Sequence, residues 1–296
     1  MRVFVTGATG FIGSALVPEL IGAGHTVLGM SRSEDGAAKL RAAGAEVLMG
    51  NLEDLDSLRR GARDADGVIH LAFSHDFSKF EQNAADERAA IAALGEVLVG
   101  TKKPLVITSG TAIAANVDGA PSTEESPLSS YNPRRGMEEV VRGLTDQGVV
   151  TSIVRLSQIH DNVKQGLVPY ITAVAKAKGV SVYLGDGSNR WPACPVASTA
   201  QLYRLAFERA EAGAIYHAVD EEDVSMKDIA EAIGRGLQVP VKSIAPEQSA
   251  EHFGWLAMFA GYSMPSSSAF TQAKLGWKPT GPSLIEDLDN MDYSAY

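Results

Sequence analysis

The chain has a single cysteine, Cys194, among its 296 residues, so no disulfide can form within it. Such chains are typical of the reducing cytoplasm, where we expect this protein to reside. Long apolar runs are also missing, since none approaches the roughly 18 residues that a membrane-spanning helix requires. No signal peptide precedes the first predicted strand. These absences favour a cytoplasmic protein without a membrane partner.

Basic residues are scarce. The chain has 26 Lys and Arg against 36 Asp and Glu, a formal charge of −10 at pH 7. Without a basic run, this balance argues against nucleic acid or an anionic membrane as a partner. We therefore expect a small-molecule ligand, and we predict no metal site. The chain is long enough for a large core and a second lobe.

The first thirteen residues contain the stretch around which the rest is organised. The apolar run Val3–Val5 predicts a buried strand, and apolar residues at helical spacing over 15–21 predict a helix. Between them lie Gly7, Gly10 and Gly13. Glycines at this spacing allow a sharp turn, a close approach of backbone to a pyrophosphate, and tight helix packing. The alternative is a glycine-rich turn that serves packing alone.

Strand and helix patterns alternate along the first half of the chain, which predicts an α/β fold with a parallel sheet covered by helices on both faces. The strands are near-continuous apolar runs, as buried parallel strands are. We predict strands at 3–5, 26–30, 46–49, 67–71, 104–108 and 149–155, and further helices at 37–43, 55–61, 84–99 and 134–144. The long loop 112–130 is rich in Ser, Pro and Glu, a composition that suits a functional loop.

Regularity loosens beyond residue 155. Helical patterns recur at 168–178, 199–212 and 226–236, while 185–192 is rich in turn-forming residues. We divide the chain into a dinucleotide-binding domain over 1–160 and a smaller lobe over 161–296.

The run Thr6-Gly7-x-x-Gly10-x-x-Gly13 at the N-terminus resembles the extended and atypical short-chain dehydrogenase/reductases, among them the NAD-dependent epimerases and dehydratases. The resemblance implies a Rossmann-type doubly wound sheet and a C-terminal lobe that caps the substrate and returns segments to the sheet. It also implies a nicotinamide cofactor, and a homodimer built on the apolar helices near 84–99 and 136–144.

The residues after the second predicted strand indicate which dinucleotide binds. An enzyme that uses NAD usually has an acidic side chain there to bond the ribose 2′-hydroxyl. This chain has Ser31, Arg32 and Ser33 instead. A guanidinium can hold a 2′-phosphate through two N–H donors, and the serines can add hydroxyls. We therefore expect NADP(H); the alternative is a solvated turn arginine.

Further cofactor contacts follow from the resemblance. Asn51-Leu52 stands where relatives contact the adenine ring, and Leu71-Ala72 stands beside the expected pyrophosphate and ribose. His70, just before them, is interpreted as a packed strand residue. The expected cofactor-binding residues are Gly7, Thr9, Gly10, Phe11, Ile12, Ser31, Arg32, Ser33, Asn51, Leu52, Leu71, Ala72, Arg135 and Ser157.

The reaction site of this family uses Tyr-x-x-x-Lys, and the matching residues here are Tyr131 and Arg135. A phenol with a pKa near 10 needs a nearby cation to exchange a proton at neutral pH. Arg135 is always charged and could supply that effect, although it cannot easily pass a proton onward. Because Pro133 complicates the start of the helix, Arg134 is an equally available cation if the register differs by one.

The family's Ser/Thr partner should follow the fifth strand. Thr111 and Ser109 are the candidates, and we favour Thr111 slightly.

Substrate contacts are expected from His75, Gln158, Tyr170 and Trp191. Bulky apolar residues in the later half would form an apolar wall suited to a hydrophobic, aromatic carbonyl compound. These residues are Val168, Tyr170, Trp191, Trp255, Met258 and Phe259.

The leading hypothesis is an NADPH-dependent reductase of ketones or related carbonyl compounds. One alternative is an NAD(P)-dependent sugar-nucleotide epimerase or dehydratase. The other is a non-catalytic NADP-binding sensor, which the altered Tyr-x-x-x-Arg pattern keeps open.

Overall fold

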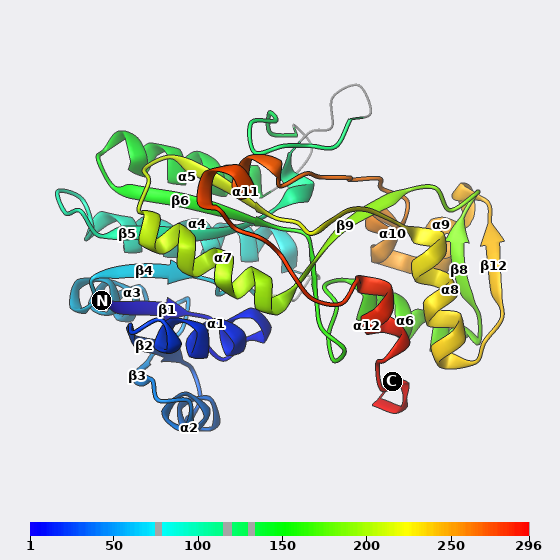
Figure 1. Ribbon diagram of the computed structural model, residues 1–296, viewed down its shortest axis with the longest axis horizontal. Helices are drawn as coiled ribbons and strands as arrows, with labels where there is room; N and C mark the ends of the chain where they lie inside the picture. The colour runs from blue at the N-terminus through cyan, green and yellow to red at the C-terminus, as the bar shows by residue number, and fades with distance from the viewer. Residues whose placement is uncertain (75–78, 115–119, 130–133, 296) are drawn as a thin grey trace.

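The computed structural model describes residues 1–74, 79–114, 120–129 and 134–295. Its centre is a seven-stranded sheet in the order β10-β6-β5-β4-β1-β2-β3, in which every neighbouring pair is parallel (Figure 1). The strands are β1 (Arg2–Thr6), β2 (Thr26–Ser31), β3 (Glu46–Met49), β4 (Gly67–His70), β5 (Pro104–Gly110), β6 (Val150–Leu156) and β10 (Ala214–Ala218). The predicted doubly wound parallel sheet is confirmed.

Helices cover both faces of the sheet, and Figure 1 shows α1 and α7 in front of it. The front face packs against α1 (Phe11–Gly22), α2 (Glu34–Ala42) and α7 (Val196–Arg209). The back face packs against α3 (Leu55–Asp64), α4 (Phe80–Glu96) and α5 (Arg135–Asp146). Because both faces are buried, each strand contributes apolar side chains alternately to two cores.

The first strand illustrates this alternation. Val3 and Val5 are fully buried in the front core, and Phe4 is fully buried in the back core. Gly61 on α3 leaves room for the ring of Phe4, because a Cβ at position 61 would lie only 2.3 Å from its Cζ. The apolar run of β1 therefore holds helices on both sides of the sheet.

Strand order reverses between β1 and β4, since the chain continues from β1 to β2 and β3 on one side and returns to β4 on the other. Thr6 and His70 are partners in register at the carboxyl ends of these two strands. In doubly wound sheets the ligand crevice opens at such a reversal, outside the carboxyl ends of the strands. The fold thus directs attention to the residues that follow β1 and β4.

Two segments beyond residue 160 belong to the sheet layers. The strand β10 pairs with β6, with Tyr216 opposite Val154, and α7 packs on α1. The short helix α11 (Ala269–Leu275) lies against β10.

The smaller lobe contains two minor sheets and its own core. Its strands are β7 (Gln158–His160), β8 (Ser181–Leu184), β9 (Arg190–Pro195), β11 (Glu221–Ser225) and β12 (Val241–Ile244). Its helices are α6 (Val168–Lys178), α8 (Met226–Leu237), α9 (Ser249–Phe253), α10 (Ala257–Ala260) and α12 (Leu284–Asp289).

The turn that we predicted over 185–192 is shorter than expected. Residues from Arg190 onward form β9, which pairs with β7 on one side and β11 on the other. The register of β11 shifts opposite Pro192, where a proline would otherwise interrupt the ladder. Pairing with distant strands therefore overrides the local turn signal.

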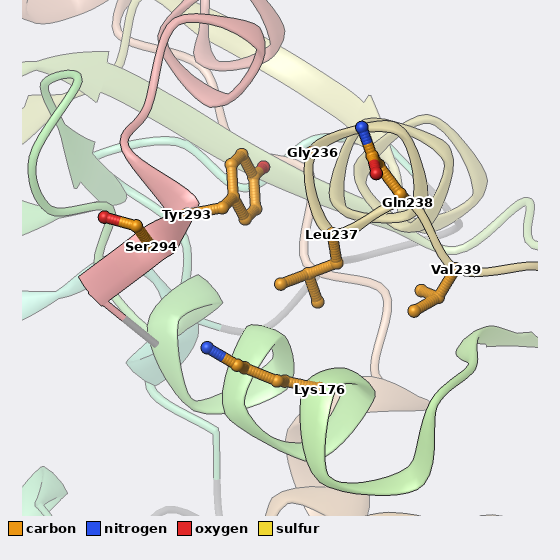
Figure 2. A pocket seen from close by; sticks show the side chains of 7 residues that line it. All are labelled: Lys176, Gly236, Leu237, Gln238, Val239, Tyr293 and Ser294. Atoms are coloured by element: carbon orange, nitrogen blue, oxygen red, sulfur yellow. The ribbon is translucent and has the colours of Figure 1, made fainter.

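The C-terminal residues close a shallow hollow on the smaller lobe. Figure 2 shows the ring of Tyr293 beside the end of α8, with Lys176 of α6 on the other side. A Cβ on Gly236 would lie 2.0 Å from Cε2 of Tyr293, so glycine at this position permits the contact. The hollow contains none of the glycine-loop residues.

Trp191 lies in the core of the smaller lobe with no exposed surface, instead of lining a substrate pocket. Its indole Nε1 donates a hydrogen bond to the backbone oxygen of Tyr262 at 3.1 Å. β9 is buried on both sides from Trp191 to Pro195, and Trp191 and Ala193 face the core of the smaller lobe.

We predict that Trp191→Ala lowers the free energy of unfolding by about 3–5 kcal/mol, because it removes a large buried side chain and leaves a cavity. Met258→Ala is the control: Met258 is 64% exposed, and its removal should change stability by less than about 0.5 kcal/mol. Urea unfolding of the three proteins measures both effects. Equal stability of parent and Trp191→Ala would contradict the prediction.

Candidate cofactor and active site

The loop after β1 is shaped by its glycines. Gly7 adopts a left-handed conformation (φ +66°), and the N–H of Gly10 donates to the backbone oxygen of Gly7 at 2.9 Å, which closes a tight turn. Helix α1 begins directly afterwards with Gly10 as its N-cap, and no side chain caps its first N–H groups. Uncapped N–H groups at a helix N-terminus form a site for an anion.

Each glycine of the motif has a different surrounding. A Cβ at Gly13 would lie 2.2 Å from the backbone oxygen of Gly7, and a Cβ at Gly7 would lie 2.8 Å from the backbone nitrogen of Ala72. Both positions therefore serve close packing of backbone. A Cβ at Gly10 would meet only the oxygen of Gly7, at 3.1 Å. The absent side chain of Gly10 keeps space free above the loop, as the approach of a pyrophosphate requires.

At the end of β2, two serines make hydrogen bonds within the chain, whereas the arginine between them makes no ion pair with a described residue. Ser31 is buried and donates to the oxygen of Ser33 at 2.8 Å, while the hydroxyl of Ser33 caps α2 by accepting the N–H of Gly36 at 3.2 Å. Arg32 is exposed and makes no ion pair with any residue that the structure describes. Its guanidinium is therefore available to a ligand phosphate.

Asn51 is also engaged locally. Its Oδ1 accepts the N–H groups of Glu53 at 2.8 Å and Asp54 at 2.9 Å, a turn that leads into α3. Leu52 packs on the back core beside it.

A buried polar pair lies at the crevice between β1 and β4. Thr6 Oγ1 and His70 Nδ1 are 2.8 Å apart, and Thr6 Oγ1 also accepts the N–H of Ala72 at 3.3 Å. Burial, with a smaller effect from the charge of Arg134, lowers the pKa of His70 to about 4. The ring is therefore neutral at neutral pH, and its contact with Thr6 holds Ala72 against the glycine loop.

Three hydroxyls lie at the end of β5, and they differ in their partners. Thr108 Oγ1 donates to the oxygen of His70 at 2.7 Å, and Thr111 Oγ1 donates to the oxygen of Leu156 at 3.3 Å. Ser109 is buried, and its Oγ has no hydrogen-bond partner within the described ranges. Of the two predicted hydroxyls, that of Ser109 is the one without a partner among the described residues, and the atom is itself buried.

The two neighbouring arginines lie in different surroundings. Arg135 forms an exposed ion pair with Glu139 on the same helix, Nη2 to Oε1 at 3.0 Å. Arg134 extends toward α4, where its Nε donates to Oε2 of the buried Glu87 at 3.1 Å. The predicted residues Tyr131 and His75 lie outside the described residues.

Ser157 and Gln158 connect strands and loops. Ser157 Oγ donates to the oxygen of Ala218 at 2.6 Å, and Gln158 Oε1 accepts the N–H of Leu167 at 2.9 Å.

From the same part of the chain, Lys164 places its Nζ 5.8 Å from the ring centroid of Phe11. Lys164 thus lies near the start of α1, a position that the sequence pattern did not indicate.

The residues of the expected apolar wall separate into two groups. Val168 and Trp191 are fully buried in the small-lobe core. Tyr170 and Trp255 are exposed and meet edge to face with ring centroids 5.4 Å apart, and Phe259 continues the contact at 6.3 Å from Trp255. Tyr170, Trp255 and Phe259 form a surface that we call the aromatic cluster.

Along the described parts of the chain, no helix has both the length and the apolar character needed to cross a membrane.

Comparison with known proteins places this site in a family. The model of the NAD dependent epimerase/dehydratase family matches residues 3–220. An uncharacterized protein of Schizosaccharomyces pombe is 47% identical over 295 residues, covering 99% of this chain and all of the relative.

Two further proteins are more distant. The 4-hydroxy-2-methyl-3-oxo-4-farnesyl-3,4-dihydroquinoline-1-oxide ketoreductase of Stigmatella aurantiaca is 26% identical over 276 residues, covering 87% of this chain and 82% of that protein. The dTDP-glucose 4,6-dehydratase DesIV of Streptomyces venezuelae, solved with NAD and TYD bound, has a similar fold, with a TM-score of 0.78 at 20% identity and coverage of 99% and 96%. The chain belongs to the NAD-dependent epimerase/dehydratase family.

Proposed function

We propose that this protein is an NADPH-dependent reductase of ketones or related carbonyl compounds. The observation that carries the proposal is the end of β2, where Arg32 is exposed without an ion-pair partner in the described residues. Positions 31–33 contain no acidic side chain that could bond a ribose 2′-hydroxyl. The guanidinium suits a 2′-phosphate, which only NADP(H) carries.

The glycine loop fits the remainder of the dinucleotide. The uncapped N–H groups of α1 would hold the pyrophosphate, and the open space above Gly10 would let it approach the backbone. Leu71 and Ala72 would line the opposite side of the crevice, because Ala72 lies against Gly7.

The proposed chemistry is a two-part reduction. NADPH, when bound, would supply the hydride that reduces the carbonyl carbon. Tyr131 donates its phenolic proton to the carbonyl oxygen, which gives the alcohol. The hydroxyl of Ser109 would orient the carbonyl oxygen, since Thr111 already donates to Leu156.

The aromatic cluster favours a hydrophobic substrate. Tyr170 and Trp255 present 39% and 44% of their surface, and aromatic rings that meet edge to face offer apolar area to an aryl ligand. The relative from Stigmatella aurantiaca is named as a ketoreductase of a dihydroquinoline oxide, which agrees with a bulky aromatic ketone.

The competing function is that of a sugar-nucleotide epimerase or dehydratase, supported by the fold shared with the dTDP-glucose dehydratase. A panel of aryl and alkyl ketones with NADPH separates the two, since a reductase consumes NADPH in proportion to product. Conversion of a sugar nucleotide without net loss of NADPH would favour the epimerase or dehydratase. Cofactor binding without turnover of any compound would favour the sensor.

Substitution of Arg32 tests which cofactor the protein prefers. Arg32→Ala should weaken NADPH binding by about 1.5–3 kcal/mol, because it removes charged hydrogen bonds to the 2′-phosphate, and NADH binding should barely change. Titration of each cofactor by fluorescence measures both constants. Arg41→Ala serves as the control, since Arg41 is exposed and reaches only Glu34 at 3.8 Å. Equal losses for NADPH and NADH would refute the assignment.

The second prediction concerns the space above Gly10. Gly10→Ala should reduce the affinity for both cofactors at least tenfold, or about 1.4 kcal/mol, because a Cβ would occupy the approach of the pyrophosphate. The folded protein should tolerate the change, since only one backbone atom lies near the added Cβ. Gly22→Ala, where a Cβ meets nothing within 4 Å, should bind both cofactors normally. Unaltered binding by Gly10→Ala would place the pyrophosphate elsewhere.

The third prediction concerns the acid. Tyr131→Phe should lower turnover by roughly 100-fold or more while NADPH still binds, because the ring remains and the proton donor is lost. Steady-state kinetics and a binding titration on the same preparation separate these effects. Activity within a few fold of the parent would exclude Tyr131 as the acid.

A further inference from the structure

Two arginines that follow each other in the sequence have opposite environments. Arg135 has 42% of its side chain exposed and pairs with Glu139, which is 51% exposed, one turn along α5. The side chain of Arg134 is 21% exposed, and its partner Glu87 on α4 is 3% exposed. An exposed pair one helical turn apart contributes little, whereas a buried carboxylate depends on its partner.

The contact between Arg134 and Glu87 is bidentate. Nε donates to Oε2 at 3.1 Å, and Nη2 donates to Oε1. A planar guanidinium that binds both carboxylate oxygens has a defined orientation, which a lysine ammonium could not reproduce. The charge of Arg134 also acts on His70 at the end of β4, where it contributes to the lowered pKa.

Arg134 also contacts the chain that leaves β4. Its guanidinium carbon lies 4.3 Å from the ring centroid of Phe73, a cation–π contact. One residue further, the oxygen of Ser74 accepts a hydrogen bond from Asn83 Nδ2 of α4 at 3.2 Å. One residue earlier, Ala72 lies against Gly7. The segment 71–74 is thus held between the glycine loop on one side and α4 with Arg134 on the other.

We infer that the Arg134–Glu87 pair is a positioning device of the cofactor crevice, which holds segment 71–74 against the glycine loop, and that Arg135 is a surface residue. The inference rests on the proposed binding of a nicotinamide dinucleotide. Arg134 acts through Phe73 and the backbone of Ala72, so its loss affects NADPH and NADH alike. That pattern differs from the loss at Arg32, which concerns the 2′-phosphate alone.

The test compares dinucleotide affinity among single variants of the full chain. Arg134→Met and Glu87→Gln should each raise the dissociation constants of NADPH and NADH about tenfold, because each removes the bidentate contact. Arg134→Lys keeps the charge but loses the planar guanidinium that binds both carboxylate oxygens. Its dissociation constants should therefore lie between those of the parent and of Arg134→Met. The double variant Arg134→Met/Glu87→Gln should raise each dissociation constant by less than the product of the two single-variant fold changes, because the two residues are coupled.

Arg142→Met on the same helix is the inert control, since Arg142 is exposed and has no ion-pair partner in the described chain. Arg135→Met tests the competing assignment and should keep parental affinity. Thermal unfolding followed by circular dichroism accompanies each titration, so that binding is measured only where the variant is folded. If Arg134→Met does not fold, Arg134→Lys and Glu87→Gln decide the question.

The outcomes separate this inference from the proposed function. A parent that binds neither dinucleotide refutes both. A parent that binds dinucleotides, with parental affinity in folded Arg134→Met, Arg134→Lys and Glu87→Gln, overturns the positioning role alone, even if those variants melt earlier. A loss of affinity in Arg135→Met with none in Arg134→Met would return the role to Arg135.

Discussion

The close approach of two backbone segments at the β1–β4 reversal is the constraint on which the site depends. Gly7 lies against the backbone of Ala72, and Gly13 lies against the oxygen of Gly7, with no room for a Cβ at either position. This packing aims the N-terminus of α1 at the crevice and brings segment 71–74 to its opposite side. The glycine loop and the segment that faces it are therefore positioned by one backbone contact.

Behind this contact lies a layer of buried polar groups on the side of α4 and α5. Arg155 and Glu138 form a bidentate pair with almost no exposure, with Nη2 and Oε2 2.8 Å apart, and Arg134 with Glu87 forms a second pair nearer the crevice. Buried charges are costly unless paired, so such pairs add little net stability. What they contribute is defined orientation of side chains between the strand ends and the two helices.

The strands of the smaller lobe form sheets of their own, and the lobe follows the main sheet through the chain that leaves β6. β7 continues the chain directly from β6, and His160 on β7 meets Asp287 of α12 with Nδ1 and Oδ2 2.6 Å apart. This contact attaches the C-terminal helix close to the strand that leaves the sheet. The aromatic cluster of Tyr170, Trp255 and Phe259 lies on this lobe.

The sequence by itself determined the parallel sheet and the glycine loop, because these depend on local periodicity and on the conformational freedom of glycine. Only the tertiary structure decided which of Arg134 and Arg135 faces α4, since consecutive side chains of a helix point about 100° apart. It likewise buried Trp191, because β9 gains its hydrogen bonds from strands distant in the chain. Glu87 gave only a weak signal, because it is one of several acids in an alanine-rich helix and its partner lies 47 residues away.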